Sequence, residues 1–306
     1  MSNIVISIDH GYKHMKTVHE FFPTTISELS SMPDDKTGIL KYNDKIYTKA
    51  GKQVENVDTQ TKTDSNEFFL LTLISIAKEM DKMEIYNAEI TLLGGLPQRW
   101  YDKQKEDFKK YLTADGQNIF FEYEGKVYNI VIRKAILFEQ GYAAFFSLDN
   151  VEQYLDGEVC IVDIGGGTMD ILLVKDGVLQ RMDCKIDTHA TLWLNNQIKE
   201  VIESELNAPI SDTSIINYIT SGSLKTPAKN KYEEVMQREL CSYTKFVYTK
   251  LKQYKINTDL IPIVFVGGGA VIMQNFTEVP GGTVEYVTDL CANAKGYKKM
   301  YDLISA

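Results

Sequence analysis

Residues 158–170 read EVCIVDIGGGTMD, and this stretch decides the fold. It predicts a buried strand that leads to Asp163, a turn with three glycines, and a second strand over 171–175. Glycine lets the backbone approach a ligand closely, and successive amides that point the same way form a nest for anions. Three adjacent glycines would otherwise cost stability, because each gives up packing. We therefore expect Gly165–Thr168 to bind phosphate; an ordinary glycine hairpin is the alternative.

The same pattern occurs once more near the start of the chain. Residues 4–11 read IVISIDHG, again an apolar strand followed by Asp-x-Gly, and Asp9 precedes Asp163 by about half the chain. The repetition predicts a duplicated domain with two equivalent β-hairpins. Lys16 follows on the second strand of the first hairpin, where its ammonium can neutralise phosphate charge, although a solvated strand lysine would look the same.

A metal ion is expected between the two hairpin carboxylates and the phosphate. Asp9 and Asp163 would both repel a phosphate group, so a cation must lie between them. Mg²⁺ held mostly through water is the natural choice, which makes these two aspartates its candidate ligands. One of them can also polarise an attacking water molecule.

A third glycine cluster lies far along the chain. Residues 264–271 read VFVGGGAV, a buried strand that runs into a position where a helix can begin and where backbone donors meet ligands. The cluster lacks the G-x-G-x-x-G spacing of a dinucleotide site, and the chain has no G-x-x-x-x-G-K-[ST]. Rossmann-type and P-loop sites are therefore not predicted.

Composition excludes several classes of protein. The 306 residues carry a net charge of −9, which argues against direct, non-specific binding to nucleic acid but allows contact through a basic partner. Cys160, Cys184, Cys241 and Cys291 are widely spaced, as expected for reduced thiols in the cytoplasm. The first apolar run meets Asp9 after about five residues, so it predicts a strand and not a signal peptide. The chain has no run of ~20 apolar residues, so the sequence predicts no membrane span.

Apolar spacing places the motifs among alternating strands and helices, in an α/β chain. The polar stretch at 55–65 has no periodicity and predicts an exposed loop. Helices are predicted over 66–82, 99–112, 139–148, 190–206, 211–219, 231–254 and 287–304.

The three glycine motifs, in this order, resemble those of the actin-like ATPase superfamily, which includes actin, heat-shock chaperone ATPases and sugar kinases. Within it the chain is most similar to the bacterial plasmid-segregation actins of the ParM or Alp type. The matching segments are phosphate loop one (Asp9–Lys16, D-x-G-x-x-x-x-K), phosphate loop two (Asp163–Thr168), the adenosine motif (Gly267–Ala270), the connecting helices at 139–144 and 293–297, and Gly-Leu-Pro at 95–97.

The resemblance implies duplicated actin-like, ribonuclease H-like domains with mixed sheets flanked by helices and a nucleotide cleft between them. Domain I would span 1–148, with a closing helix at about 293–306 that packs back on it. Domain II would span 149–292, with a small helical lobe at about 190–255.

The resemblance also implies a role for each site residue around ATP or GTP with Mg²⁺. Asp163 would orient or activate the attacking water, and Glu139 or, as a rival, Gln140 would be the second water-positioning residue. Actin has a serine where this chain has Tyr12, and a phenol is too large to copy that hydroxyl, so its backbone N–H is expected to bind instead. The nucleotide-binding residues would be Asp9, Gly11, Tyr12, Lys13, Lys16, Gly165, Gly166, Gly167, Thr168, Arg238, Glu239, Gly267, Gly268, Gly269 and Ala270.

The function implied is that of a cytoplasmic NTPase that polymerises. Nucleotide binding would favour a head-to-tail filament, hydrolysis would destabilise it, and a small DNA-binding adaptor would link the filament to a plasmid. Direct binding to nucleic acid or to a membrane is not expected. A small-molecule kinase of the same fold is disfavoured, because the chain shows no further acid-glycine element for a second substrate. A non-polymerising, nucleotide-binding scaffold stays open as the other alternative.

Overall fold

The computed structural model describes residues 1–54, 62–226, 229–278 and 282–305, and it divides into two compact units. Unit 1 comprises Met1–Ser147 together with Leu290–Ala306, and unit 2 comprises Leu148–Asp289. Among the described helices, none is long and apolar enough to cross a membrane.

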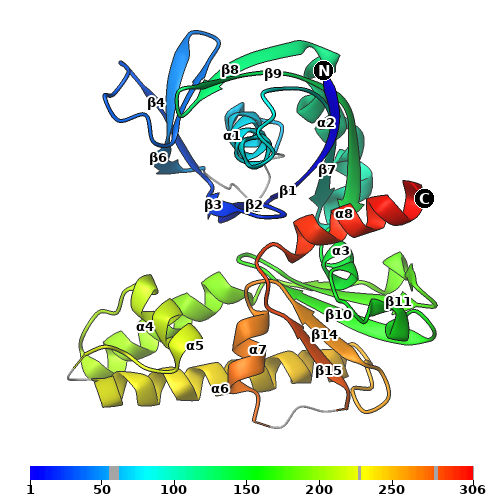
Figure 1. The fold of residues 1–306 in the computed structure, drawn as a ribbon. Coiled ribbons are helices and arrows are strands. Elements are labelled where there is room, and N and C mark those ends of the chain that lie inside the picture. The colour runs from blue at the N-terminus through cyan, green and yellow to red at the C-terminus, as the bar shows by residue number, and fades with distance from the viewer. Residues whose placement is uncertain (55–61, 227–228, 279–281, 306) are drawn as a thin grey trace. The chain divides into compact units, whose positions relative to one another are not determined.

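Unit 1 is built on a nine-stranded mixed sheet in the order β3-β2-β1-β7-β9-β8-β5-β6-β4. Its strands are β1 (Ser2–His10), β2 (His14–Thr17), β3 (Phe21–Pro23), β4 (Thr25–Leu29), β5 (Ile39–Tyr42), β6 (Lys45–Gln53), β7 (Asn87–Leu96), β8 (Asn118–Tyr123) and β9 (Lys126–Glu139). The sheet curls around α1 (Glu67–Lys82), as Figure 1 shows. Because strands face this helix on several sides, its sequence EFFLLTLISIAKEM is apolar nearly all round and is buried along most of its length. Phe108 and Leu112 of α2 (Gln98–Thr113) join the same core.

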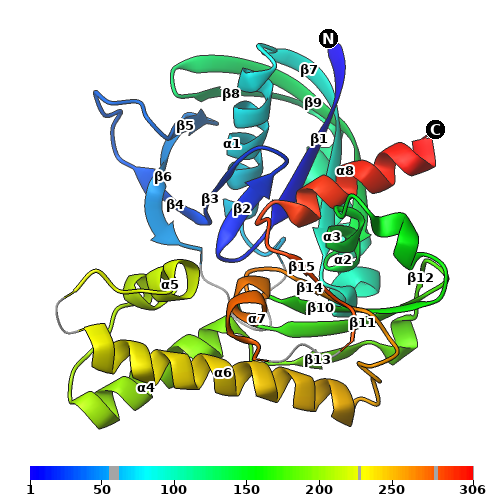
Figure 2. The ribbon, with the colours of Figure 1, turned by 60° about the horizontal axis from the view of Figure 1, so that its bottom comes forward.

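Unit 2 holds a smaller sheet and a helical lobe. The sheet runs β12-β11-β10-β14-β15, and β13 (Lys185–Asp187) also pairs with β11. Its other strands are β10 (Glu158–Ile164), β11 (Met169–Lys175), β12 (Val178–Leu179), β14 (Ile263–Val266) and β15 (Val284–Val287). Its helices are α4 (Thr191–Leu206), α5 (Asp212–Ser221), α6 (Lys229–Gln253) and α7 (Ala270–Phe276). Figure 2 shows α4 and α6 side by side, and their apolar residues form one core with those of the sheet.

Both units share one topology, which confirms the predicted duplication within an α/β fold. β1 pairs antiparallel with β2 and parallel with β7, and β10 pairs antiparallel with β11 and parallel with β14. A further parallel strand follows in each sheet, β9 beside β7 and β15 beside β14. Within the two hairpins, Asp9 lies opposite Lys16 and Asp163 lies opposite Asp170. The two predicted phosphate loops therefore occupy the same place in their sheets.

Two predicted helix boundaries are wrong. The helix expected over 139–148 shrinks to α3 (Tyr142–Phe146), because β9 continues to Glu139 and Gly141 then adopts a φ of +72° that ends the strand. The helix expected over 287–304 is α8 (Ala292–Ser305), because residues 284–287 form β15 on the edge of the unit 2 sheet. That strand is short and only partly buried, so it leaves little apolar pattern to detect.

Close packing between α3 and α8 depends on Gly296, and Gly296→Ala is expected to destabilise unit 1 by about 3 kcal/mol. A Cβ at this position would lie 1.8 Å from the carbonyl oxygen of Ala143, a backbone atom that cannot turn away. Chemical denaturation measures the loss. Gly167→Ala is the matched control, because a Cβ there meets no atom within 4 Å among the described residues. Equal stability of the two variants would contradict the packing argument.

Candidate functional site

Phosphate loop one turns its backbone carbonyls toward the body of unit 1. Each of four successive carbonyl oxygens accepts a hydrogen bond from a group elsewhere in that unit: His10 O from Lys62 Nζ (2.5 Å), Gly11 O from Thr24 Oγ1 (2.6 Å), Tyr12 O from Gln53 Nε2 (2.7 Å) and Lys13 O from the Thr24 amide (3.1 Å). Carbonyl oxygens repel anions. A loop that ties them back is therefore suited to present amides to a phosphate group.

Asp9 lies at the centre of a polar cluster at the end of β1. Its carboxylate is 2% exposed and accepts hydrogen bonds from Lys16 Nζ (3.1 Å), Gln140 Nε2 (2.7 Å) and Asn293 Nδ2 (3.5 Å). Burial alone would raise the pKa of Asp9, but the positive charges of Lys16 and Lys62 outweigh it and hold that pKa below its usual value. The carboxylate is therefore ionised at neutral pH.

Gln140 and Glu139, the two rival water-positioning residues, lie at the end of β9. The Glu139 side chain is mostly buried, at 8% exposed, whereas Gln140 extends to Asp9. The backbone amide of Gln140 donates to Leu96 O of the neighbouring strand at 2.9 Å, which fixes the chain where β9 ends. Asn293, the third partner of Asp9, belongs to a motif that the sequence identifies as a connecting helix. Its contact with the carboxylate was not predicted.

The other two predicted residues of loop one differ in exposure. Tyr12 is half-buried, and its ring meets that of Phe68 edge-on at 6.0 Å between centroids. Lys13 is exposed. Within unit 1 the structure therefore gathers Asp9, Lys16 and Gln140 into one cluster and leaves Lys13 on the surface.

Phosphate loop two in unit 2 is tied back in the same way. Its Gly165 amide donates to Thr168 O at 2.9 Å, which closes the turn. The start of α4 then holds the loop carbonyls, because Gly165 O accepts from Thr191 N and Oγ1 at 3.2 and 3.0 Å, and Gly166 O accepts from Leu192 N at 3.0 Å. Sequence reasoning missed Thr191, the first residue of α4, because its hydroxyl donates to a loop 26 positions earlier and leaves no local signal in the sequence.

The adenosine motif packs directly against Asp163. Gly267 has a φ of +82°, and a Cβ there would lie 2.4 Å from Asp163 Oδ1. The amide of Gly269 donates to Ile164 O at 2.9 Å, and Asp163 pairs with Val266 in the parallel register of β10 and β14. The carboxylate thus fills space that only glycine leaves open. The structure brings the second and third glycine motifs together, and Ala270 of the third motif is the first residue of α7.

An ion-pair cluster stabilises the segment that leads into α4. Asp187 Oδ1 accepts from the His189 amide at 2.9 Å and from its Nδ1 at 2.5 Å, and Lys250 Nζ lies 2.9 Å from Asp187 Oδ2. Burial alone would raise the pKa of Asp187, but these donors outweigh it and lower the pKa to about 2. The cluster fixes the residues that precede Thr191, and Thr191 in turn holds loop two through its hydrogen bonds to Gly165 O.

Asp187→Asn is expected to remove an acid-sensitive part of the stability of unit 2. Because the folded pKa lies below the model-peptide value of 3.8, the carboxylate stabilises the fold fully above about pH 4, and this contribution is lost as the pH falls toward 2. We expect the stability difference between wild type and variant to be about 1–2 kcal/mol larger at pH 5 than at pH 2.5. Urea unfolding across this range measures it. A difference that does not change with pH would contradict the assignment.

Arg238 and Glu239, the predicted base contacts, lie together on α6. Arg238 is exposed, and its guanidinium pairs with Glu205 at 2.6 Å and with Glu239 at 3.0 Å. The pair with Glu205 connects α6 to the end of α4, whereas the pair with Glu239 lies within α6. The structure thus places both residues in the helical lobe, and their part in base binding stays a prediction.

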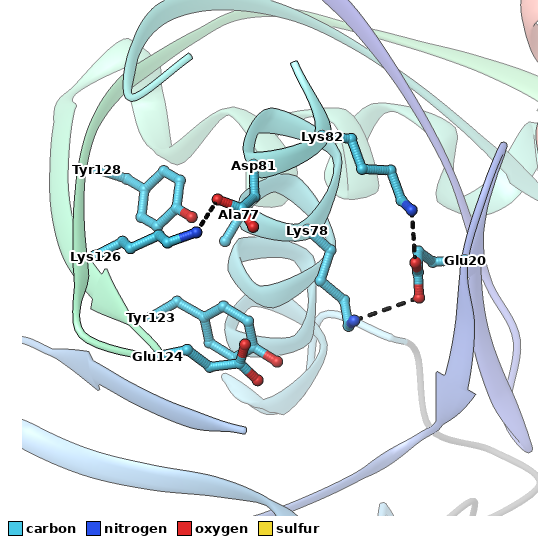
Figure 3. Close-up of a pocket in the computed structure, with 9 residues that line it drawn as sticks. All are labelled: Glu20, Ala77, Lys78, Asp81, Lys82, Tyr123, Glu124, Lys126 and Tyr128. Atoms are coloured by element: carbon cyan, nitrogen blue, oxygen red, sulfur yellow. Dashed lines mark hydrogen bonds and ion pairs between the residues drawn. The ribbon is translucent and has the colours of Figure 1, made fainter. Parts of the chain in front are cut away.

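A surface hollow at the C-terminal end of α1 offers no rival anion site. Figure 3 shows its lysines turned toward acidic partners: Lys78 and Lys82 pair with Glu20 at 3.3 and 2.9 Å, and Lys126 pairs with Asp81. Its positive charges are thus already matched by carboxylates. None of the predicted site residues lines it.

Within its own unit, Asp163 fits a small cation such as Mg²⁺ held mostly through water. Among the described residues, no group of three or more His, Cys, Asp or Glu side chains forms a direct metal cage. Asp163 is half-buried and can offer a carboxylate oxygen to the water shell of a small cation, whereas Asp9 is 2% exposed and already accepts from three side chains.

Residues 7–142 match the family model described as "Actin like proteins N terminal domain". No curated protein is significantly similar in sequence to the chain. Solved structures match over almost its whole length. A Bacillus thuringiensis ParM with ATP is 16% identical with a TM-score of 0.71, over 100% of this chain and 99% of that one.

Two filament structures match equally well. A 15-stranded ParM filament from Clostridium botulinum is 17% identical with a TM-score of 0.74, over 99% of this chain and 100% of that one. The Alp12 filament structure is 16% identical with a TM-score of 0.74, over 100% of both chains. These findings confirm the predicted resemblance to the actin-like proteins of the ParM and Alp type.

Proposed function

Because residues 7–142 match the family model of the actin-like protein N-terminal domain and the whole chain has the actin-like fold, we propose that the protein is a nucleotide-driven, polymerising NTPase. It binds ATP or GTP with Mg²⁺, assembles head-to-tail and releases subunits after hydrolysis. One observation carries the proposal: both phosphate loops tie their carbonyls into their own unit, beside a carboxylate at the end of a strand.

The residues of unit 1 bind and orient the phosphates in this proposal. Lys16 supplies positive charge, and the amide of Tyr12 supplies a donor, whereas the amide of Gly11 donates to Asp9 O and shapes the loop. Asp9 is held ionised by Lys16, and Gln140 fixes its orientation at 2.7 Å. Phosphoryl transfer needs positioning and charge compensation above all, and this cluster offers both.

The residues of unit 2 prepare the attack. Asp163 accepts a proton from, or orients, the attacking water, and the amides of Gly166, Gly167 and Thr168 stabilise the charge that develops on the phosphate oxygens. The Gly165 amide closes the turn on Thr168 O. Gly268 leaves the backbone open toward the nucleoside, because a Cβ there would meet no described atom within 4 Å, whereas Gly269 packs against Ile164. Bound Mg²⁺ would neutralise phosphate charge, with Asp9 and Asp163 acting on it through water.

Coupling to assembly follows from the link between loop two and α4. Thr191 and Leu192 donate hydrogen bonds to the loop carbonyls. A movement of loop two on loss of the γ-phosphate would therefore displace the start of the helical lobe. A filament that prefers the triphosphate state would bind that state more tightly, and hydrolysis would weaken it by the same free energy. The net charge of −9 suits a small basic adaptor as the link to plasmid DNA.

Equilibrium titration with Mg-ATP, Mg-GTP and Mg-ADP tests the binding part of the proposal. We expect saturable, one-site binding that chelation of Mg²⁺ weakens. No binding of any nucleotide at millimolar concentration would contradict the proposed function.

A further inference from the structure

Lys62 is a buried lysine that no sequence motif marks. It lies in the polar stretch 55–65, whose predicted exposure is wrong at this residue, since Lys62 is 4% exposed. Residues 55–61 of that stretch lie outside the described residues. Burying an ammonium is costly unless the protein provides partners, so the position needs a physical reason.

The surroundings of Lys62 keep it charged and point it at phosphate loop one. Its Nζ lies 5.2 Å from the centroid of the Tyr12 ring, 5.8 Å from that of Phe68 and 5.9 Å from that of Phe108, a cage of π faces that favours a cation. Burial lowers the pKa of Lys62 to about 8, so it remains mostly protonated at neutral pH. The ammonium donates to His10 O at 2.5 Å.

That single hydrogen bond fixes a peptide at the base of the loop. Lys62 holds the carbonyl of the His10–Gly11 peptide, and the amide of Gly11 donates to Asp9 O at 3.0 Å. Both polar groups of this peptide are thus held in place. The other donors to the loop carbonyls come from Thr24 and Gln53, which are neutral, so Lys62 alone among these four contacts adds charge.

We propose that Lys62 is a positioning residue for phosphate binding, which fixes the His10 carbonyl and adds a second positive charge beside Lys16, so that loop one prefers a triphosphate to a diphosphate. The inference rests on the proposed function. The preference for a triphosphate is Coulombic, because the attraction between the fixed positive charge of Lys62 and a nucleotide grows with the negative charge of the nucleotide. A residue that only stabilised the structure of the loop would change the affinities for ATP and ADP by the same factor.

Lys62→Gln and Lys62→Arg separate the two roles. Glutamine retains a donor for His10 O without the charge, and arginine retains the charge. Lys52→Gln, at an exposed position on β6, is the matched control. Calorimetric titration with Mg-ATP and with Mg-ADP, at one salt concentration, gives the ratio of the two affinities, and thermal unfolding without nucleotide reports on the fold.

We expect Lys62→Gln to weaken ATP binding by about tenfold and ADP binding by about threefold or less, so that the preference for ATP falls. Lys62→Arg should restore the preference, and Lys52→Gln should behave as wild type. Should Lys62→Gln fail to fold, Lys62→Met carries the same prediction, because a thioether suits an aromatic cage.

An equal loss for both nucleotides, or no loss, would overturn the role of the charge. Failure of the proposed function looks different, because the wild-type protein itself would then bind neither nucleotide. The comparison therefore tests Lys62 only where the wild type binds.

Discussion

Replacing Asp163 by asparagine should lower the rate of phosphate release by about 10²- to 10⁴-fold while nucleotide binding persists. Asparagine has the same shape as aspartate and fits the space that Gly267 leaves beside the side chain, so loop two keeps its geometry. It cannot accept a proton from water, and it lacks the charge that orients one. Filaments that assemble with ATP should therefore persist instead of disassembling.

The measurement is phosphate release under saturating Mg-ATP, paired with a binding titration. Asp156→Asn is the control, because Asp156 is exposed and lies two residues before the start of β10. Gly267→Ala provides a second test, since its Cβ would displace the Asp163 carboxylate and should also suppress hydrolysis. Wild-type turnover in Asp163→Asn would remove this residue from the mechanism.

Replacing Lys16 by methionine should weaken ATP binding by about 10- to 100-fold, the loss expected for a charge-assisted contact to phosphate. The same change leaves the buried Asp9 without the cation that lies 3.1 Å away. Removing one partner of a buried pair is costly, so unit 1 should also lose about 3 kcal/mol of stability.

A double variant separates the two effects of Lys16. Asp9→Asn together with Lys16→Met removes the uncompensated charge, so stability should recover while ATP affinity stays low. Lys52→Met, at an exposed position on β6, controls for the loss of a lysine from the same unit. If the double variant recovered ATP affinity together with stability, Lys16 would act on the fold and not on the nucleotide.

Local patterns carried the prediction of the fold because each phosphate motif lies in a strand-turn-strand segment whose geometry is set by near neighbours. The buried runs before Asp9 and Asp163 and the glycines after them predict the two hairpins, and their repetition predicts the duplication. The contact between Gly267 and Asp163 follows, because neighbouring parallel strands end at the same edge of a sheet.

Contacts between segments far apart in the sequence could not be predicted in this way. Lys62 lies in a polar stretch typical of a solvated loop, and only the folded unit places its ammonium among three aromatic rings. Asn293 is 284 positions from Asp9. Gln140 and its neighbour Glu139 were both candidates for the water-positioning residue. The contact of Gln140 with Asp9 depends on where β9 ends, which apolar patterning does not resolve.

Light scattering of the purified protein on addition of Mg-ATP, with phosphate release followed in the same cuvette, tests the central claim most directly. We predict that scattering rises, and that it decays as phosphate is released and ATP is consumed. Stable scattering without release would indicate a static filament. Phosphate release with flat scattering at high protein concentration would contradict nucleotide-driven polymerisation.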